Sequence, residues 1–300
     1  MTAPPTPPTT MPSTTPTSAQ PLPRISIVTP SFNQGRFLAE TIDSVLAPRY
    51  PNLEYVVIDG GSTDHSADVI RSREKDLAAW VSEKDGGQYD AINKGFAKTT
   101  GDVMAWLNSD DKYTPWALHV VGEIFQQLPE VQWLTTLLPL HWDARGLPTK
   151  CKPVHGYTKA GFFRGQHLQR PGEWDKAFIQ QESTFWRRSL WEQAGGKIDP
   201  SLRLAGDFEL WAKFYQHADL YGVGLPLGGF RLHGEQKTAQ QMEQYFKEAE
   251  TVLARHGGRF DPSPKPNPRS TLWRKLFKQT HDYKICINRG GRWTVTNRWL

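Results

Sequence analysis

The sequence has only two cysteines, Cys151 and Cys286, among its 300 residues. They lie far apart and belong to no CxxC or Cys/His cluster, which argues against a structural zinc site and against a disulfide framework. No stretch of about 18 apolar residues is present, so the sequence predicts no membrane-spanning helix. The first residues lack the basic start and apolar core of a secretory signal and the arginine-rich pattern of a transit peptide. We therefore expect a cytoplasmic protein.

Residues 1–22 have almost no large apolar side chains and no charge. They contain seven prolines and seven threonines, and such a segment cannot bury enough surface to offset the entropy lost on ordering. A second stretch, with alternate prolines from Pro262 to Pro268, predicts a stiff linker. We therefore expect a disordered leader over 1–22, one folded domain over 23–260, and a linker with a separate tail over 261–300.

The tail carries most of the positive charge. Residues 269–300 contain eight Lys or Arg and one Asp, a balance of +7 in a chain whose net charge is +5. Tryptophan, leucine, phenylalanine and isoleucine are mixed with these charges, a combination that suits an anionic membrane surface. No zinc spacing, RNA-recognition signature or helix-turn-helix pattern accompanies them, so no nucleic-acid partner is expected. The sequence predicts peripheral membrane contact through this tail.

Short β-rich runs alternate with helical patterns from Arg24 onward. The runs end in polar or glycine-containing loops and occupy residues 24–30, 53–61, 78–85 and 102–108. This alternation predicts an α/β fold with a mostly parallel, Rossmann-like central sheet flanked by helices. Ligands of such sheets bind beyond the carboxyl ends of the strands, and the polar residues at those ends are Thr29, Asp59, Asp85 and Asn108 to Asp111. Later apolar spacing predicts helices over 182–196, 206–218 and 240–257.

Asp110 and Asp111 follow directly after the fourth run. A carboxylate in front of a helix that starts near Pro115 often serves as an N-cap, and this interpretation stays open. Two adjacent carboxylates at a ligand-binding edge also repel each other unless a cation is close. Mg²⁺ or Mn²⁺ with a substrate phosphate is the usual partner of such a pair. The two aspartates therefore favour a site for a divalent cation.

Seven short motifs follow one another over roughly residues 24–240. They read TPSFNQ (29–34), DGGSTD (59–64), EKDGGQYDAINKG (83–95), LNSDD (107–111), QESTFWRR (181–188), GDFELW (206–211) and FRLHG (230–234). In this order they resemble the motifs of family 2 glycosyltransferases. The resemblance implies the GT-A fold and an enzyme that moves a sugar from a nucleotide-diphosphate donor with inversion of the anomeric centre.

The resemblance also implies where the donor binds. Asp59 and Asp85 match the family's nucleotide-reading carboxylates, although Asp59 with Ser62 and Thr63 is also typical of a tight turn. Asn108 stands where the family's DxD motif has its first acid, and an amide there can bind a ribose but adds no charge. The expected donor contacts are Thr29, Asn33, Asp59, Asp85, Gln88, Asp90, Lys94 and Asn108.

A metal ion and a base complete the implied site. Asp110, supported by Asp111, is the expected ligand of Mg²⁺ or Mn²⁺. His233 resembles a late histidine that completes the metal shell or touches the diphosphate in some relatives, although a lone histidine is more often structural. A dication there stabilises the charge that develops on a departing diphosphate. Asp207 matches the family's general base, with Glu209 as second choice. A helix N-cap role for Asp207 is compatible with that assignment.

Other enzyme classes fit the sequence less well. Processive synthases of the family carry membrane helices and a QxxRW motif, and TNRWL at residues 296–300 lacks the glutamine, so transfer of a single sugar is expected. A sugar nucleotidyltransferase needs a Gly-rich basic loop after the first strand, and a dinucleotide dehydrogenase needs GxGxxG there; TPSFNQGRF supplies neither.

A non-catalytic glycan- or nucleotide-binding domain is the alternative from another class, because Asn108 replaces an acid. For the enzyme, the expected partners are a nucleotide-diphosphate sugar and a glycan or lipid-linked acceptor. Family habit implies a role in surface glycan synthesis, in the cytoplasm or at the inner face of the membrane.

Overall fold

Four apolar runs in the first third of the chain form neighbouring parallel strands, in the order β3-β2-β1-β4. The strands are β1 (Ile25–Ser31), β2 (Leu53–Asp59), β3 (Ala79–Ser82) and β4 (Val103–Trp106). The helical segments between them are α1 (Gly35–Leu46), α2 (Ser66–Arg71), the 3₁₀ turn η1 (Glu74–Asp76) and α3 (Gln88–Phe96). β1 is buried along its whole length, including its polar residues Ser26, Thr29 and Ser31, as is typical of a central strand covered on both faces. The predicted parallel sheet is confirmed.

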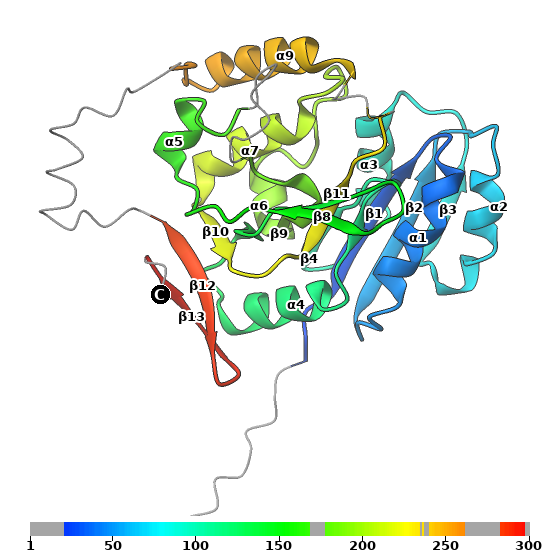
Figure 1. Cartoon of the computed structure of the whole chain (residues 1–300), viewed down its shortest axis with the longest axis horizontal. Helices are drawn as coiled ribbons and strands as arrows, with labels where there is room; N and C mark the ends of the chain where they lie inside the picture. The colour runs from blue at the N-terminus through cyan, green and yellow to red at the C-terminus, as the bar shows by residue number, and fades with distance from the viewer. Residues whose placement is uncertain (1–20, 169–177, 235, 237–239, 262–282, 298–300) are drawn as a thin grey trace, which may run out of the picture.

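Five more strands extend this sheet beyond β4, as the computed structural model in Figure 1 shows. They are β9 (Phe185–Arg187), β6 (Trp133–Thr136), β10 (Leu220–Val223), β12 (Lys284–Arg289) and β13 (Arg292–Thr296). β9 runs antiparallel to both β4 and β6, and β13 runs antiparallel to β12. The flanking helices are α4 (Ala117–Gln127), α5 (Lys159–Phe163), α6 (Arg188–Gln193), α7 (Gly206–His217) and α9 (Met242–Arg255).

A second, four-stranded sheet brings distant parts of the chain together. Its order is β5-β11-β7-β8, and its strands are β5 (Lys112–Tyr113), β11 (Gly228–Arg231), β7 (Leu140–Trp142) and β8 (Pro148–Cys151). β5 follows the Asp110–Asp111 pair directly, and β11 pairs with it. The small sheet therefore joins the turn after β4 to segments more than a hundred residues later.

A cluster of large aromatic side chains forms the core beneath these elements. Four fully buried tryptophans come from β4, β6, β9 and α7; they are Trp106, Trp133, Trp186 and Trp211. The ring of Trp211 stacks on that of Trp106, with centroids 6.1 Å apart, and on that of Trp133, at 5.5 Å. Because α7 is fixed in this way against the centre of the sheet, its first turn holds a defined position beside the end of β4.

The structure describes residues 21–168, 178–234, 236, 240–261 and 283–297. Most of the predicted leader and all four prolines of the predicted linker lie outside these ranges. The described part of the tail differs from our prediction of a separate segment, because β12 pairs in parallel with β10 and so belongs to the central sheet. Trp293 of β13 fastens the hairpin to α4, with its indole nitrogen 2.9 Å from Glu123. Within the described ranges, every helix is too short or too polar to cross a bilayer.

The segment 182–196 also differs from prediction. We expected one helix, whereas the chain forms a 3₁₀ turn, η2 (Gln181–Ser183), then strand β9, then the short helix α6. Trp186 pairs with Met104 of β4 on one side and with Trp133 of β6 on the other. Ladder bonds to two neighbouring strands outweigh the local helical spacing here, and this is a tertiary effect that sequence periodicity does not contain.

Candidate active site

Two adjoining cavities open at the carboxyl ends of the central strands. The first has a volume of about 530 Å³ and is lined by residues from the loops after β1, β2, β3 and β4. The second, of about 370 Å³, lies towards α7 and the small sheet. Four residues line both cavities and mark their junction; they are Gln88, Asn108, Phe230 and Gln236. Asp110 lines the first cavity and Asp207 the second, so the two predicted reactive carboxylates face one continuous cleft.

The turn that carries Asp110 and Asp111 is held by two buried side chains. The hydroxyl of Thr41 in α1 donates hydrogen bonds to the carbonyl oxygens of Ser109, at 2.9 Å, and of Asp111, at 2.7 Å. Arg231 of β11 donates from Nε to the carbonyl of Asp110. The guanidinium of Arg231 is only 1% exposed and also binds Glu40 at 2.7 Å. The turn is therefore fixed from both sides, and the Asp110 carboxylate is presented to the cavity.

The two aspartates have different environments. The Oδ2 atom of Asp110 lies 3.0 Å from Nε2 of His233, at the lining of the first cavity. Asp111 is 1% exposed, and its carboxylate accepts hydrogen bonds from the backbone N–H of Arg231 and from the amide of Asn108. Burial, followed by the negative charges of Asp110 and Glu182, raises the pKa of Asp111 well above its usual value. Asp111 lines neither cavity and its oxygens bind within the turn, so its role as a metal ligand stays a prediction.

Asp110 offers the first cavity a carboxylate oxygen of the kind that binds a divalent cation. Mg²⁺ is typically held by one or two carboxylates together with substrate phosphates. His233 lies 3.0 Å from Asp110, but its side chain is fully buried and lines neither cavity. The described residues contain no group of three or more His, Cys, Asp or Glu side chains that holds a metal by itself. A divalent cation at Asp110 would therefore need further ligands from a bound donor.

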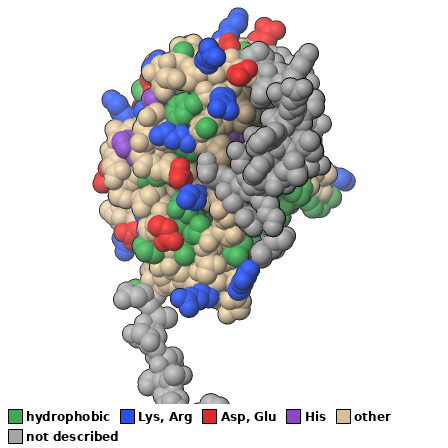
Figure 2. Space-filling view, turned by 90° about the vertical axis from the view of Figure 1, so that its left-hand side faces the viewer, with side chains coloured by type: hydrophobic (Ala, Val, Ile, Leu, Met, Phe, Trp, Pro, Cys, Tyr) green, Lys and Arg blue, Asp and Glu red, His purple; other side chains and the backbone are tan. Residues whose placement is uncertain are grey.

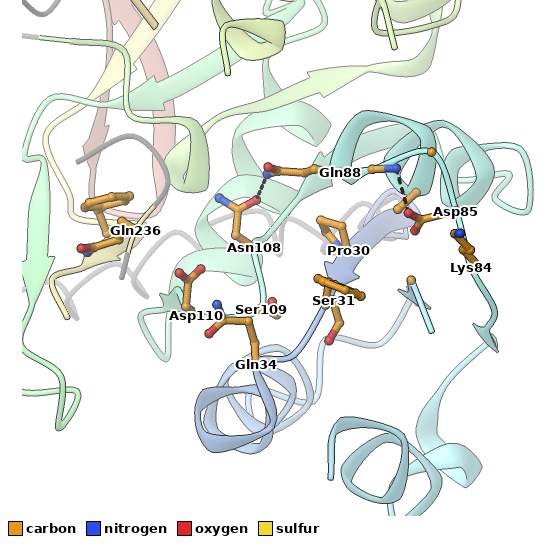
Figure 3. Close-up of a pocket in the computed structure, with 16 residues that line it drawn as sticks. Pro30, Ser31, Gln34, Lys84, Asp85, Gln88, Asn108, Ser109, Asp110 and Gln236 are labelled. Atoms are coloured by element: carbon orange, nitrogen blue, oxygen red, sulfur yellow. Dashed lines mark hydrogen bonds between the residues drawn. The ribbon is translucent and has the colours of Figure 1, made fainter. Parts of the chain in front are cut away.

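Three of the predicted donor contacts line the first cavity, and Figure 3 shows how they lie. Asn108 and Gln88 face each other, and the Gln88 amide donates to Oδ1 of Asn108 at 2.8 Å. Asp85 accepts a bond of 2.8 Å from the backbone N–H of Gly87. Gly60 borders the same space, where a Cβ atom would lie 2.9 Å from the Asp85 carboxylate. The glycine thus leaves room for Asp85 at the cavity wall.

Three other predicted donor residues bind within the protein and line neither cavity, and their donor contacts stay predictions. Thr29 is fully buried and its hydroxyl bonds to that of Tyr55, whereas Ser31, two positions further along β1, lines the cavity. Asp59 is also fully buried, and its carboxylate accepts bonds from Ser62 and from Ser82 at 2.7 Å. The side chain of Asn33 accepts a bond from the Thr63 N–H. Asp59 and Asn33 therefore shape the loops around the cavity, as the turn interpretation of DGGSTD proposes.

Asp90 and Lys94 form an ion pair with each other, with Oδ2 and Nζ 3.1 Å apart along α3. Asp90 also accepts a hydrogen bond from the backbone N–H of Gly86 at 2.8 Å, which closes the start of the helix. Neither residue lines the cavity in the described part of the chain. The pair holds the loop that carries Asp85, and its donor contacts stay predictions.

Asp207 lies in the first turn of α7 and lines the second cavity. The helix begins one residue earlier, at Gly206, whose N–H donates to the Tyr89 hydroxyl at 2.9 Å. Burial raises the pKa of Asp207 to about 6, against the opposing effect of a bond from the Phe208 N–H. Glu209 points elsewhere, is 3% exposed, and pairs with Lys213 at 2.7 Å. Of the two predicted bases, only Asp207 reaches the cleft.

The QES segment of the QESTFWRR motif contributes two cleft residues to which we had assigned no role. Gln181 donates to the carbonyl of Trp106 at 2.7 Å and accepts a bond from the Asn108 amide at 3.2 Å. Glu182 lines the second cavity and is 3% exposed. Arg231 and Gln236 were missed as well. Periodicity does not identify these residues. For Gln181 and Glu182, the QESTFWRR motif was the only signal.

Comparison with known proteins finds similarity over part of this chain. Residues 26–136 match the family model described as glycosyl transferase family 2. An uncharacterized glycosyltransferase of Nostoc sp. is 39% identical over 106 residues, which are 34% of this chain and 33% of the relative. An uncharacterized glycosyltransferase of Rickettsia prowazekii is 28% identical over 231 residues, 74% of this chain and 69% of the relative. A putative teichuronic acid biosynthesis glycosyltransferase of Bacillus subtilis, TuaG, is 33% identical over 94 residues, 30% and 37% of the two chains. This chain thus spans about a third of the length of the Nostoc relative.

Solved structures share the fold at low identity. TarS 1–349 of S. aureus in complex with UDP-GlcNAc superposes with a TM-score of 0.58 at 16% identity, covering 78% of this chain and 66% of TarS 1–349. The mannosyltransferase PcManGT of Pyrobaculum calidifontis, in complex with GDP-Man and Mn²⁺, gives a TM-score of 0.55 at 18% identity, covering 87% and 73% of the two chains. The predicted GT-A fold is confirmed by these likenesses.

Proposed function

We propose that this protein transfers one sugar from a nucleotide-diphosphate sugar to an acceptor hydroxyl, with inversion at the anomeric carbon. The match of residues 26–136 to the glycosyl transferase family 2 model and the GT-A fold of the chain support this proposal. The observation that carries the proposal is the continuous cleft, in which Asp110 and Asp207 line adjoining cavities with four residues in common. The two groups that an inverting displacement needs, one near the leaving group and one near the acceptor, thus occupy its two ends.

The first cavity would hold the donor. Asp85 and Asn108 offer hydrogen-bond partners for ribose or base, and Gln88 extends along the wall towards the junction. Asp110, with His233 beside it, would hold Mg²⁺ or Mn²⁺ against the diphosphate. When bound, the cation supplies Lewis-acid stabilisation of the leaving group, an effect worth several kcal/mol. TarS and PcManGT were solved with UDP-GlcNAc and with GDP-Man plus Mn²⁺, which supports this assignment of the cavity.

The second cavity would hold the acceptor. Asp207 would accept the proton of the attacking hydroxyl, because its pKa of about 6 leaves it ionised at neutral pH yet more basic than an exposed aspartate. The displacement occurs at the junction of the cavities, so base and leaving group lie on opposite sides of the anomeric carbon. A base in that position is the requirement for inversion.

Nucleotide binding tests the proposal directly. We expect UDP or GDP with Mn²⁺ to raise the unfolding temperature by several degrees, since a ligand at 100 times its dissociation constant stabilises by about 2.7 kcal/mol. A panel of nucleotide sugars, assayed for release of UDP or GDP with and without Mn²⁺, then identifies the donor. Stabilisation without any turnover across donors and acceptors would favour the non-catalytic binding domain that Asn108 leaves open. No stabilisation by any nucleotide would contradict both functions.

The proposed acceptor is a glycan or a lipid-linked glycan, and the proposed location is the cytoplasm, at the inner face of the membrane. The TuaG relative is described as acting in teichuronic acid biosynthesis, which supports a role in surface glycan synthesis. Figure 2 shows the side that bears α5 and the β12–β13 hairpin, where positive and negative side chains are interspersed. We assign the proposed membrane contact to the basic residues of 269–282, which lie outside the described residues.

We expect the triple change of Arg274, Lys275 and Lys278 to glutamate to abolish sedimentation with vesicles that contain phosphatidylglycerol. Each basic residue near an anionic surface is worth about 1 kcal/mol, so three reversals lower binding at least 10-fold. These substitutions are preferable to truncation after Pro268, which would also remove β12 from its pairing with β10. Vesicles of phosphatidylcholine alone are the control. Equal sedimentation of wild type and variant would contradict membrane contact through the tail.

A further inference from the structure

Glu182 is a buried carboxyl group with unused hydrogen-bonding capacity at the wall of the second cavity. It is 3% exposed, and its Oε1 atom has no partner in the described part of the chain. Burial and the negative charges of Asp207 and Asp110 raise the pKa of Glu182 to about 8, against hydrogen bonds from its own backbone and from the Gln180 side chain. Native proteins rarely leave such a group unsatisfied. A ligand that fills the cavity would provide the missing partner.

The neighbours of Glu182 hold it rigidly. Gln180 binds the backbone of Leu140 through both its amide nitrogen and its oxygen, at 2.8 and 3.2 Å. Ser183 donates to the carbonyl of Gly228 at 3.1 Å and accepts from its N–H at 3.0 Å. Every polar side chain from Gln180 to Ser183 except Glu182 is thus bound to the backbone of another element. The position of Glu182 is set by this frame, in which the Gln180 side chain also hydrogen-bonds to its carboxyl group.

Other residues around the same cavity define the chemistry of its occupant. Trp106 Nε1 and His141 Nδ1 are also buried without a partner in the described residues, and both side chains belong to the cavity lining. The rings of Tyr89, Phe230 and Tyr245 line it too. Unpartnered polar atoms among aromatic rings suit a sugar ring, whose hydroxyl groups donate and accept hydrogen bonds and whose C–H faces pack on aromatic side chains. An acidic group at this end would be repelled by Asp207 and Asp110.

We infer that Glu182 is a substrate-binding residue that holds a ring hydroxyl of an acceptor sugar beside Asp207. The inference rests on the proposed function for the identity of the site, and goes beyond it in naming the residue and a neutral sugar ring as the part of the acceptor that enters. Lys150 and Arg203 line the same cavity but are exposed, so any charged portion of a longer acceptor lies outside, at the mouth.

The test measures binding of methyl glycosides by saturation-transfer NMR, with UDP or GDP and Mn²⁺ present. A panel of methyl glucoside, galactoside, mannoside and N-acetylglucosaminide in both anomeric forms provides the probes. For any glycoside that binds the wild type, we expect Glu182→Leu to raise the dissociation constant at least 10-fold. Glu182→Gln keeps a donor and an acceptor at this position, so its dissociation constant should stay within 3-fold. Glu182→Asp withdraws the group by one methylene and should also weaken binding about 10-fold, which covers a failure of the leucine variant to fold.

Glu209→Gln is the matched control. Glu209 is a glutamate with the same 3% exposure and also has one unpartnered oxygen, but it pairs with Lys213 and lines neither cavity. Its variant should bind glycosides as the wild type does. Unchanged glycoside binding in Glu182→Leu would overturn the inference. So would binding of farnesyl phosphate, but of no glycoside, to a protein that nucleotides stabilise. If glycosides bind in a way that depends on Glu182 but no nucleotide stabilises the protein, the proposed function is contradicted and this inference is supported.

Discussion

Replacement of Asp207 by asparagine is expected to lower the turnover number by about 10³-fold. A positioned general base contributes about 10² to 10⁴ in rate, and Asp207 is the acidic residue of α7 that reaches the second cavity. Asparagine keeps the size and the oxygen that accepts the Phe208 N–H at 2.7 Å, so the fold of the turn is preserved. Stabilisation by UDP or GDP should be unchanged, because Asp207 does not line the first cavity. Steady-state kinetics with the donor found by the panel measure the loss.

The pH dependence gives the same prediction a second readout. Since only the ionised carboxylate accepts a proton, kcat/KM of the wild type should fall tenfold per pH unit as the pH drops below about 6, the pKa to which burial raises Asp207. Full turnover by the Asp207→Asn variant, or a wild-type kcat/KM that does not fall below about pH 6, would show that another residue is the general base. Glu209→Gln is the control variant and should retain the limb.

In the Asp207→Asn variant at pH 7, we expect stability to rise while activity falls. A buried aspartate with a raised pKa is favoured in its protonated form in the folded state, so its ionisation costs stability as the pH rises from about 4 to about 6. At pH 7 that cost is fully present, and at about 1.4 kcal/mol per pKa unit it amounts to about 3 kcal/mol at most. Asp207→Asn should therefore unfold at a higher temperature than wild type at pH 7, and the gain should vanish near pH 4. Such a gain together with lost turnover is typical of a catalytic group.

The position of the cleft was predictable because parallel strands share one carboxyl edge. Once the alternation of strands and helices is read, Asp85, Asn108 and Asp110 must meet at that edge, and they do. The resemblance to family motifs predicted Asp207 as a further site residue. Helical or strand periodicity alone does not predict that Asp207 lies beside the end of β4. The stacking of Trp211 in α7 on Trp106 in β4 explains that placement in physical terms.

The choice between neighbouring side chains was not predictable. A shift of one residue turns a side chain to the other face of a strand or turn, so Thr29 points into the core and Asp111 into the turn. What decides the second case is Arg231, which lies 120 positions later and donates to Asp111 at 2.8 Å. The place of β12 in the sheet is equally non-local, because it depends on pairing with β10 across the linker. Contacts over such distances in the sequence leave no local signal.

Replacement of Asp110 by asparagine should remove the effect of Mn²⁺ both on kcat/KM and on the thermal stability of the nucleotide complex. Asp110 is the carboxylate that lines the first cavity beside His233, and an amide oxygen is a much weaker ligand for a hard cation than a carboxylate. Loss of several kcal/mol of leaving-group stabilisation corresponds to a fall of about 10² to 10⁴ in kcat/KM. The variant should also lose the extra thermal stabilisation that Mn²⁺ gives to the UDP or GDP complex, which can be measured without any acceptor.

Asp111→Asn is the informative neighbour of this variant. Its side-chain oxygen still accepts the bond from the Arg231 N–H, so we expect a less stable turn but a Mn²⁺ concentration for half-maximal activity close to that of wild type. His233→Gln should raise that concentration, because its Nε2 atom lies 3.0 Å from Asp110 Oδ2. The three variants separate a ligand from a structural carboxylate one position away. If Asp110→Asn kept the wild-type Mn²⁺ response while Asp111→Asn lost it, the geometry of the turn would have to reverse when donor and cation bind.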